Sequence, residues 1–438
     1  MRINRKKGGA LAAGALSVAL VAAACGSDSG GSSASGNNNS GSKGSDEEIT
    51  LTVATFNEFG YEELVEEYMD ANPGIKVVHK KAATADEARE NLNTRLAAGS
   101  GLSDIEALEV DWLAELMVYS DNFVDLSDPE VEGRWLDWKV AAATTADGKL
   151  IGYGTDIGPE AICYRADLFE EAGLPTDREE VADLLEGDWD TYFNVGKEFT
   201  ANSDVAWFDS ASAIYQGLIN QVDAAYETED GEILGIDNPT VKGIYDQVLT
   251  ASVDDDLSAH FEQWSEDWTN AFQTDGFATM LCPGWMLGVI EGNAEGVDGW
   301  DIADVFPGGG GNWGGSYLTV PTQTDHPEEA KKLAAWLTAP EQQIKAFKSK
   351  GTFPSQVEAL DSEELKSATE PFFNDAPVGE ILANRAEAIT VTPFKGPNYF
   401  AIHQTVANAL LRVDVNKTDD AQSSWEKALS DFEELGLE

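Results

Sequence analysis

The stretch that decides the fold is EEITLTVATFNEFGYEELVEEYMDANPGIKVVHK, Glu47–Lys80. Its first apolar residues, Ile49, Leu51 and Val53, alternate with threonines, which predicts a strand that ends at Asn57. Apolar residues then recur at helical spacing until NPG, a sequence that stops a helix. The run IKVVHK after this stop predicts a second strand.

The same alternation of strand and helix continues beyond this stretch. A helix is predicted in ADEARENLNTRLAAG, residues 85–99, and a strand in DIEALEV, residues 104–110. The order β-α-β-α-β is typical of a sheet flanked by helices. Ligands of such sheets meet the loops at the carboxyl ends of the strands. Those ends are here NEFG, Asn57–Gly60, and DWL, Asp111–Leu113.

The composition limits the partners that this protein can have. The chain has 438 residues, a length that fits two or more domains, and its 79 acidic and 28 basic residues give a net charge of −51. So acidic a surface repels phosphates and anionic lipid headgroups, which argues against nucleic acid and against an anionic ligand. We interpret the acidity as a solubilising feature rather than the mark of a cationic ligand.

Residues 1–24 are typical of a signal peptide, because a basic start, MRINRKK, precedes an apolar run that ends in three alanines. Cys25 and a Gly/Ser-rich stretch follow, an order that resembles a bacterial lipoprotein signal in which the cysteine receives lipid. Residues 25–46 would then be a flexible tether. Such signals usually have leucine where this chain has Ala22, so a plain A-x-A cleavage site is the alternative. We expect the mature protein to work outside the cytoplasm.

Two further cysteines, Cys163 and Cys282, stand in strand-like contexts. In an oxidising compartment we expect them to pair in a disulfide, and two buried free thiols are the alternative. The four histidines are scattered without the spacing of a metal site, so no metal is expected.

The stretch VFPGGGGNWGGSYLTVP, Val305–Pro321, contains a formal G-x-G-x-x-G. A nucleotide-binding loop needs a helix that starts within it. Here an apolar and β-branched run closed by proline follows, which predicts a strand, so we expect no nucleotide. Further on, HPEEAKKLAAWLTAPEQQIKAFKSK, residues 326–350, predicts one long helix.

Several motifs are spread over the mature chain in a distinctive order. They are the lipid-type cysteine with its tether, TFNEFG, EVDWLAEL, GYGTDIGPEAICYRADLFEEAGLP, ATMLCPGWM, GGSYLTVP with HPEEAKKLAAWLTAPEQQ after it, and KGTFPS. This order resembles the extracellular solute-binding proteins of bacterial carbohydrate ABC importers, the group that includes maltose-binding protein. Within that group the resemblance is closest to actinobacterial members for oligosaccharides such as cellobiose or xylobiose.

The resemblance implies an α/β fold of the type II periplasmic-binding-protein kind, in which two lobes enclose a ligand cleft. Laid on this chain, the family pattern puts crossings between the lobes near Asp156, Gly315 and Gly351. The expected first lobe is then residues 47–156 and 317–350, and the second lobe is residues 157–316 and 351–438.

A cleft that binds a sugar needs aromatic side chains against the ring faces and planar polar groups around the hydroxyl rim. Trp285 matches a cleft aromatic of the family, and Trp313 stands in the glycine-rich loop. Among the acids, Asp111 follows a strand and Asp156 stands at a crossing. The full set of expected ligand-binding residues is Asn57, Glu58, Asp111, Trp112, Asp156, Trp207, Asp209, Trp264, Trp285, Trp313, Gly314 and Gly315.

The resemblance further implies a monomeric receptor that is held on the outer face of the cell membrane through Cys25. It would bind a neutral oligosaccharide and deliver it to the permease subunits of an ABC transporter. No catalytic residue, cofactor, metal or nucleic acid is expected, and the lipid anchor is the expected contact with the membrane. Two alternatives stay open. One is a secreted glycoside hydrolase, which needs two carboxyl groups about 5–10 Å apart, and the other is a surface adhesin or sensor lipoprotein.

Overall fold

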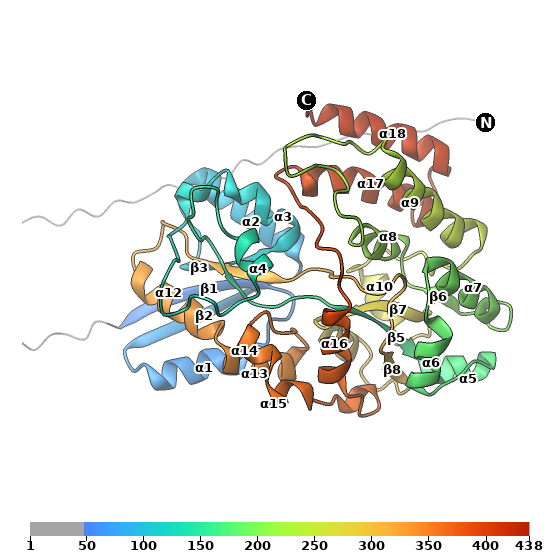
Figure 1. The fold of residues 1–438 in the computed structure, drawn as a ribbon, viewed down its shortest axis with the longest axis horizontal. Helices are drawn as coiled ribbons and strands as arrows, with labels where there is room; N and C mark the ends of the chain where they lie inside the picture. Colours follow the sequence, from blue (N-terminus) through green and yellow to red (C-terminus); the bar gives the residue numbers. More distant parts are fainter. Residues whose placement is uncertain (1–47, 438) are drawn as a thin grey trace, which may run out of the picture. The chain divides into compact units, whose positions relative to one another are not determined.

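The computed structural model describes residues 48–437, which form two β-sheets with helices packed around them (Figure 1). The predicted signal peptide of residues 1–24, the predicted lipidation residue Cys25 and the predicted tether of residues 25–46 lie outside the described residues. Within residues 48–437, no helix combines the length and the apolar character that a bilayer crossing needs.

The first sheet has five strands in the order β2-β1-β3-β9-β4. Their bounds are β1 Ile49–Phe56, β2 Ile75–Ala82, β3 Ile105–Glu109, β9 Ser316–Thr319 and β4 Tyr153–Gly154. β1 is parallel to β2 and to β3, whereas β9 is antiparallel to both β3 and β4. The helices α1 (Glu62–Ala71) and α2 (Ala85–Ala98) connect the parallel strands, so the predicted β-α-β-α-β order is confirmed.

The second sheet has four strands in the order β6-β7-β5-β8. Their bounds are β6 Ala206–Phe208, β7 Phe277–Pro283, β5 Glu160–Arg165 and β8 Trp300–Ala303. Every residue of the two central strands, β5 and β7, is buried, which is typical of strands covered on both faces. Cys163 on β5 and Cys282 on β7 form a disulfide, with their Cα atoms 5.4 Å apart, so the structure contains the expected pair and not two free thiols.

The remaining helices fill the connections between strands and the C-terminal part of the chain. Before β9 they are α3 Val110–Met117, η1 Ser120–Asn122, α4 Asp137–Ala142, α5 Ala166–Ala172, α6 Arg178–Leu185, α7 Trp189–Thr200, α8 Ala211–Ile219, α9 Pro239–Leu249, the π-helical η2 Thr250–Asp254, α10 Glu266–Ala271 and α11 Met286–Asn293. After β9 they are α12 Pro327–Leu337, α13 Pro340–Lys350, α14 Val357–Leu360, α15 Glu363–Lys366, η3 Pro371–Phe373, α16 Val378–Glu387, α17 Tyr399–Asp414 and α18 Ala421–Glu434.

Separate hydrophobic cores cover the two sheets. Leu51 and Val53 of β1 belong to the core of the first sheet. The second sheet has a core on each face, because the neighbours Ile162 and Cys163 on β5 point to opposite faces and belong to different cores. Helix α13 lies where cores meet, since its Ala346 packs in the core of the first sheet and its neighbour Phe347 packs in a core of the second.

Three segments that connect the regions of the two sheets lie side by side. The Thr155 N–H donates to the Ser316 carbonyl (2.9 Å), and the Ile157 N–H donates to the Phe353 carbonyl (2.8 Å). Gly315 has φ +105°, and a Cβ there would lie 2.8 Å from the Asp156 carbonyl oxygen, so glycine is needed for this close approach. The stretches that the family pattern marks as crossings therefore touch one another between the two sheets.

Two expectations about individual elements are wrong. The predicted single helix of residues 326–350 is two helices, α12 and α13, because Pro340 lacks an N–H and forces Ala339 into an extended conformation (φ −75°, ψ 158°). The expected loop DWL after β3 is instead helical, because α3 begins at Val110. The Glu109 carboxylate accepts the Asp111 N–H (2.7 Å) and caps this helix.

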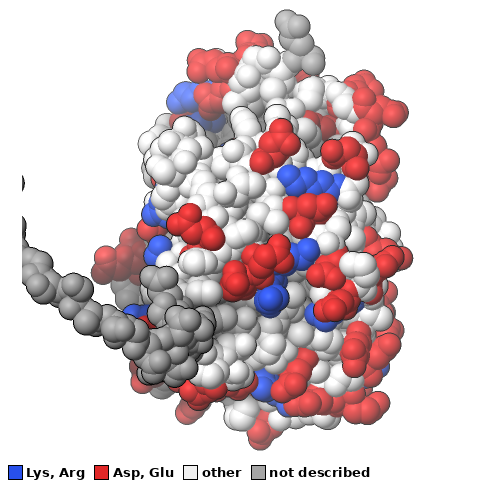
Figure 2. All heavy atoms as spheres, turned by 90° about the vertical axis from the view of Figure 1, so that its left-hand side faces the viewer, with Lys and Arg blue, Asp and Glu red and all other residues white. Residues whose placement is uncertain are grey.

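One face of the molecule carries charges of both signs, and most of them are acidic (Figure 2). Figure 2 shows the side of the molecule that lies to the left in Figure 1, where acidic side chains are spread over the face with Lys and Arg between them. This face has no continuous basic patch of the kind that binds a polyanion.

Candidate functional site

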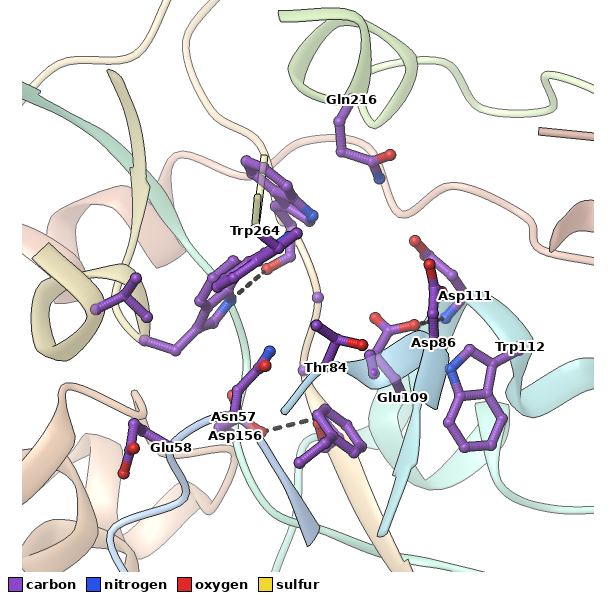
Figure 3. Close-up of a pocket in the computed structure, with 18 of the residues that line it drawn as sticks. Asn57, Glu58, Thr84, Asp86, Glu109, Asp111, Trp112, Asp156, Gln216 and Trp264 are labelled. Atoms are coloured by element: carbon purple, nitrogen blue, oxygen red, sulfur yellow. Dashed lines mark hydrogen bonds between the residues drawn. The ribbon is translucent and has the colours of Figure 1, made fainter. Parts of the chain in front are cut away.

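A cavity of about 230 Å³ lies beside the three crossing segments, where the carboxyl ends of the first sheet's strands face side chains from the region of the second sheet (Figure 3). The strand ends and the helices after them contribute Asn57, Glu58, Thr84, Asp86, Glu109, Asp111 and Trp112. The crossing segments contribute Asp156, Gly314, Gly315, Ser316 and Thr352, and the opposite wall contributes Gln216, Trp264, Trp285, Trp313, Phe400, His403 and Gln404. A ligand in this cavity would touch both halves of the fold.

Most of the residues expected to bind ligand meet in this one cavity. The expected residues that line it are Asn57, Glu58, Asp111, Trp112, Asp156, Trp264, Trp285, Trp313, Gly314 and Gly315. Trp207 and Asp209 do not line it. The fold therefore gathers residues from distant parts of the chain, although their role in binding remains a prediction.

The expectation that Trp207 contacts ligand is wrong, because its indole is part of a core. Trp207 lies on β6, is fully buried, and stacks on Phe169 with ring centroids 5.5 Å apart. Tyr192 packs on it from α7 at 5.3 Å. A tryptophan in a strand of three residues is hard to distinguish from a loop tryptophan in the sequence, and the surrounding helices decide which way it faces.

Asp209 also lies outside the cavity wall. Its side chain is fully buried just after β6, and its Oδ2 atom accepts hydrogen bonds from Trp268 Nε1 and from Gln263 Nε2, both at 2.8 Å. Direct contact between Asp209 and a ligand in the cavity is thereby excluded in this structure.

Three indoles form one wall of the cavity, which we call the indole wall: Trp264, Trp285 and Trp313. Trp264 and Trp285 are nearly parallel, with ring centroids 6.1 Å apart and an interplanar angle of 27°. Trp313 stands edge-on to Trp285 at 5.5 Å, and Trp285 Nε1 donates to the Trp313 carbonyl (3.0 Å). Trp264 is 37% exposed, so part of a large apolar face is left for a ligand.

The glycine-rich loop Gly308–Gly315 is built around Trp313 and not around a phosphate. The Trp313 N–H donates to the Gly158 carbonyl (2.8 Å). A Cβ at Gly158 would lie 1.8 Å from the Trp313 carbonyl oxygen, so another residue there would displace the loop. The strand β9 follows this loop as predicted, without the helix start that a pyrophosphate needs.

Carboxyl groups from the strand ends and from a crossing segment also line the cavity, and several already have partners. Glu58 forms an ion pair with Lys81 (2.6 Å), and Asp111 forms one with Lys395. Asp156 accepts hydrogen bonds from the Ser316 N–H (2.9 Å) and from the Thr155 hydroxyl (2.6 Å). These contacts fix the carboxylates in place, so they can present hydrogen-bond acceptors in a constant geometry.

Burial raises the pKa of three acids that line the cavity. Burial, and after it the charge of Asp111, raises the pKa of Glu109 well above the usual range of a glutamate. Burial also raises the pKa of Asp86 and that of Asp156, although the nearby Lys139 ammonium lowers the latter.

Lys139 lies beneath the floor of the cavity. Its side chain is buried, and its Nζ atom is 4.0 Å from the centre of the Tyr317 ring and would lie 2.9 Å from a Cβ at Gly315. Burial lowers the pKa of Lys139 to about 8, against the opposing charges of Asp156 and Glu109. The Lys139 ammonium therefore lies close enough to Asp156 and Glu109 to offset part of their negative charge.

Residues that the sequence reasoning missed complete the site. Thr84 and Asp86 follow β2, and Phe400, His403 and Gln404 lie on α17. Thr84 and Asp86 could have been predicted, because the rule that ligands meet the carboxyl ends of strands applies to β2 as it does to β1 and β3. The residues of α17 gave no signal, because its apolar spacing reads as an ordinary core helix.

His403 is neutral at physiological pH. Tyr226 OH lies 3.1 Å from its Nδ1 atom and Tyr399 stacks on its ring, with centroids 5.8 Å apart. Burial lowers the pKa of His403 to about 4, although the charge of Asp111 acts in the opposite direction. A neutral imidazole can donate or accept a hydrogen bond without adding charge to the cavity.

Three buried polar atoms of the lining have no hydrogen-bond partner in residues 48–437: Asn57 Oδ1, Trp112 Nε1 and Thr352 Oγ1. One is an acceptor, one is a donor and one can act as either. Buried polar groups are normally satisfied, so such atoms in a cavity wall indicate a polar ligand or water. Together with the indole wall, they match the apolar faces and hydroxyl rim of a sugar.

Comparison with known proteins gives a consistent result. The profile of the family described as bacterial extracellular solute-binding protein matches residues 63–374. The arabinooligosaccharide-binding protein of Bacillus subtilis is 26% identical over 411 residues, which are 88% of this chain and 90% of that protein.

Solved structures agree with this family match. A crystal structure of an extracellular solute-binding protein of family 1 is 54% identical, has a TM-score of 0.77, and covers 88% of this chain and 99% of its own. The binding protein of Bifidobacterium animalis subsp. lactis, solved with β-1,6-galactobiose, is 21% identical with a TM-score of 0.75, and covers 89% of this chain and 98% of its own. The second likeness concerns the fold alone, which is the two-lobed α/β fold expected from the sequence.

Proposed function

Because the chain belongs to the bacterial extracellular solute-binding proteins, we propose that it captures a neutral oligosaccharide in the cavity and delivers it to the permease of an ABC importer. Members of this family are binding proteins. The observation that carries the proposal is the indole wall facing a rim of fixed carboxyl, amide and hydroxyl groups across one cavity.

The proposed lobes are residues 47–156 with 317–350 and residues 157–316 with 351–438. Each would contain one of the two sheets, and the three crossing segments would serve as the hinge. A ligand that contacts both lobes stabilises the closed form by its differential affinity for that form. The closed form is then the one that docks on the permease.

The proposed location is the outer face of the cell membrane, with the lipid on Cys25 and the mature protein acting as a monomer. Cys25 precedes the described residues, so this part of the proposal rests on the sequence pattern. The tether of residues 25–46 would let the folded part reach both free sugar and the permease.

Named relatives guide the choice of sugars to test. The Bacillus subtilis relative is named for arabinooligosaccharides, and the Bifidobacterium structure contains a galactobiose. A panel should therefore contain short oligosaccharides of arabinose, galactose, glucose and xylose, including cellobiose and xylobiose. The acids of the cavity predict that uronic acids and sugar phosphates bind poorly, because like charges repel.

A thermal-shift screen over this panel tests the proposal. At 100 times its dissociation constant, a ligand that binds the folded form adds about 2.7 kcal/mol to the free energy of unfolding. We expect a marked rise in Tm with at least one neutral oligosaccharide, which chromatography then recovers intact. Release of monosaccharide would instead identify a hydrolase, and binding to a polymer but to no short oligosaccharide would identify an adhesin.

A further inference from the structure

Asp209 is a buried carboxylate placed directly behind the indole wall. It is fully buried, and its Oδ2 atom accepts two hydrogen bonds, from Trp268 Nε1 and Gln263 Nε2, each at 2.8 Å. The Phe261 N–H also donates to the Asp209 carbonyl oxygen (3.3 Å). One residue thus holds both the segment before Trp264 and the indole after it.

Trp264 depends on these neighbours for its position. Its backbone has φ +70°, a left-handed conformation that is costly for a residue other than glycine and persists when surrounding contacts impose it. Its ring lies between two others: Trp268, with centroids 5.1 Å apart, and Trp285, at 6.1 Å. Because 37% of Trp264 is exposed, these two rings are its main packing contacts.

We propose that Asp209 is a positioning residue of the sugar site, whose carboxylate fixes Gln263 and Trp268 and through them keeps Trp264 in the indole wall. The proposal rests on the proposed function, because it assigns Trp264 to the saccharide. Asp209 itself touches no ligand. It acts through the hydrogen bonds that it accepts from the Trp268 indole and from the side-chain amide of Gln263, the residue before Trp264.

The strength of the hydrogen bonds that Asp209 accepts from Gln263 and Trp268 depends on its charge. Both donors bind Oδ2, and the buried Oδ1 has no hydrogen-bond partner among residues 48–437. Hydrogen bonds to an ionised carboxylate are about twice as strong as neutral ones. Burial raises the pKa of Asp209 to about 6, while the hydrogen bonds from Gln263 and Trp268 act in the opposite direction. As the pH falls through about 6 the carboxyl gains a proton, and its hold on the two donors weakens.

The elements packed around Asp209 carry other titratable groups, and each of them lies in different surroundings. Tyr192 on α7 is buried, and burial raises its pKa away from this range. Glu266 and Asp267 lie at the exposed start of α10. His260 precedes Gln263 and contacts Asp414 of α17, with Nδ1 2.7 Å from Oδ1. Substitution of Asp209 alone leaves all of these in place, so a difference between two pH profiles isolates Asp209.

The test compares the wild type with Asp209→Asn by calorimetric titration with the best neutral oligosaccharide of the panel, between pH 5 and pH 8. We expect wild-type affinity to fall roughly tenfold from pH 7.5 to pH 5 in excess of any fall in the variant. Asp209→Asn should bind weakly at pH 7.5 also, because an amide cannot offer the charged acceptor. Identical pH profiles in the two proteins would overturn the proposal.

Trp268→Phe is the second variant, and it keeps an aromatic ring against Trp264 while it removes one donor to Asp209. Since this lost bond stabilised the ionised form, the midpoint of the pH profile should move to higher pH. A merely structural role for Trp268 would lower stability without moving that midpoint, which would also overturn the proposal. This variant keeps the test decisive if Asp209→Asn does not fold.

A measurement without sugar separates this proposal from the proposed function. Near-UV circular dichroism of the ligand-free wild type should show a change in tryptophan signal with a midpoint near pH 6, which Asp209→Asn lacks. If this change is present and no saccharide binds, the proposed function fails while the role of Asp209 in holding the indoles stands. If the wild type binds sugar but neither signal nor affinity responds to Asp209→Asn, the positioning role fails.

Discussion

Trp285 is the central residue of the indole wall, because its ring contacts both Trp264 and Trp313. It is the N-cap residue of α11, and its ring Nε1–H donates to the Trp313 carbonyl. Its remaining face is the surface on which a pyranose or furanose ring can lie. The sequence pointed to this residue through its family motif, and the structure adds the neighbours that fix its orientation.

Trp285→Ala should weaken binding of the captured sugar by about 2 kcal/mol, or roughly thirtyfold in Kd, because a central aromatic contact is lost. The loss in the free energy of unfolding without sugar should be smaller. Trp207→Phe is the matched control, since Trp207 is buried in a core and should lose stability but keep its Kd. Calorimetric titration and urea unfolding measure the two quantities. Equal losses of binding and stability in Trp285→Ala would place Trp285 in the core.

Gly158→Ala should disturb the same wall from behind. The new Cβ would lie 1.8 Å from the Trp313 carbonyl oxygen, so the loop must move, at a cost of about 2 kcal/mol in stability and tenfold or more in Kd. Gly243→Ala in α9 is the control, because its Cβ would meet nothing within 4 Å and it should gain up to about 1 kcal/mol. If urea unfolding and titration give the same result for both variants, the close approach at Gly158 is unimportant.

At the scale of elements, the strands of the first sheet were the part most open to prediction. The alternation in β1 and the stops NPG and Gly99 set the boundaries locally, and the strand ends placed Asn57 in the site. Trp207 and α17 show why the rest was hidden. A tryptophan in a short strand and an amphipathic helix have the same local pattern whether they face a core or a cavity, and long-range packing decides between the two.

Helix α17 joins the site by packing against α3 from the other half of the fold. The Arg89 guanidinium carbon on α2 lies 4.2 Å from the centre of the Phe400 ring, and Lys395, just before α17, pairs with Asp111. These contacts carry His403 and Gln404 to the cavity. Their positions therefore depend on the relative placement of the two proposed lobes.

His403 predicts a pH dependence of stability. Its pKa is lowered to about 4 in the folded protein, below the value of about 6.5 expected when unfolded, so the unfolded chain binds more protons between these values. The contribution of neutral His403 to the free energy of unfolding is complete above pH 6.5 and is lost as the pH falls towards 4. Between pH 7 and pH 4.5, the wild type should lose about 2 kcal/mol more than His403→Gln in urea unfolding. Parallel losses would show that His403 is accessible to protons in the folded state.

At the scale of the whole molecule, we propose that binding is coupled to closure of the cavity. The crossing segments join the two sheets, and the Lys395–Asp111 pair spans the same gap on another side. A sugar that touches Trp285 and Asn57 together favours the arrangement in which both are within reach. The net charge of −51 should play no direct part in this step, because the proposed ligand is uncharged.

Closure predicts a change of size in solution. Small-angle X-ray scattering of the protein with saturating neutral oligosaccharide should give a smaller radius of gyration than the ligand-free protein. Trp285→Ala at the same sugar concentration should remain closer to the ligand-free value, since it binds weakly. An unchanged radius of gyration despite calorimetric binding would mean that the sugar enters a rigid cavity.

A crystal structure of the complex with the best saccharide of the panel tests the central claim most directly. We predict a sugar ring against Trp285, with its hydroxyl groups on Asn57 and on the acids that follow β2 and β3, so that both proposed lobes touch the ligand. A saccharide bound elsewhere, or one held by a single lobe with the indole wall unoccupied, would contradict the account.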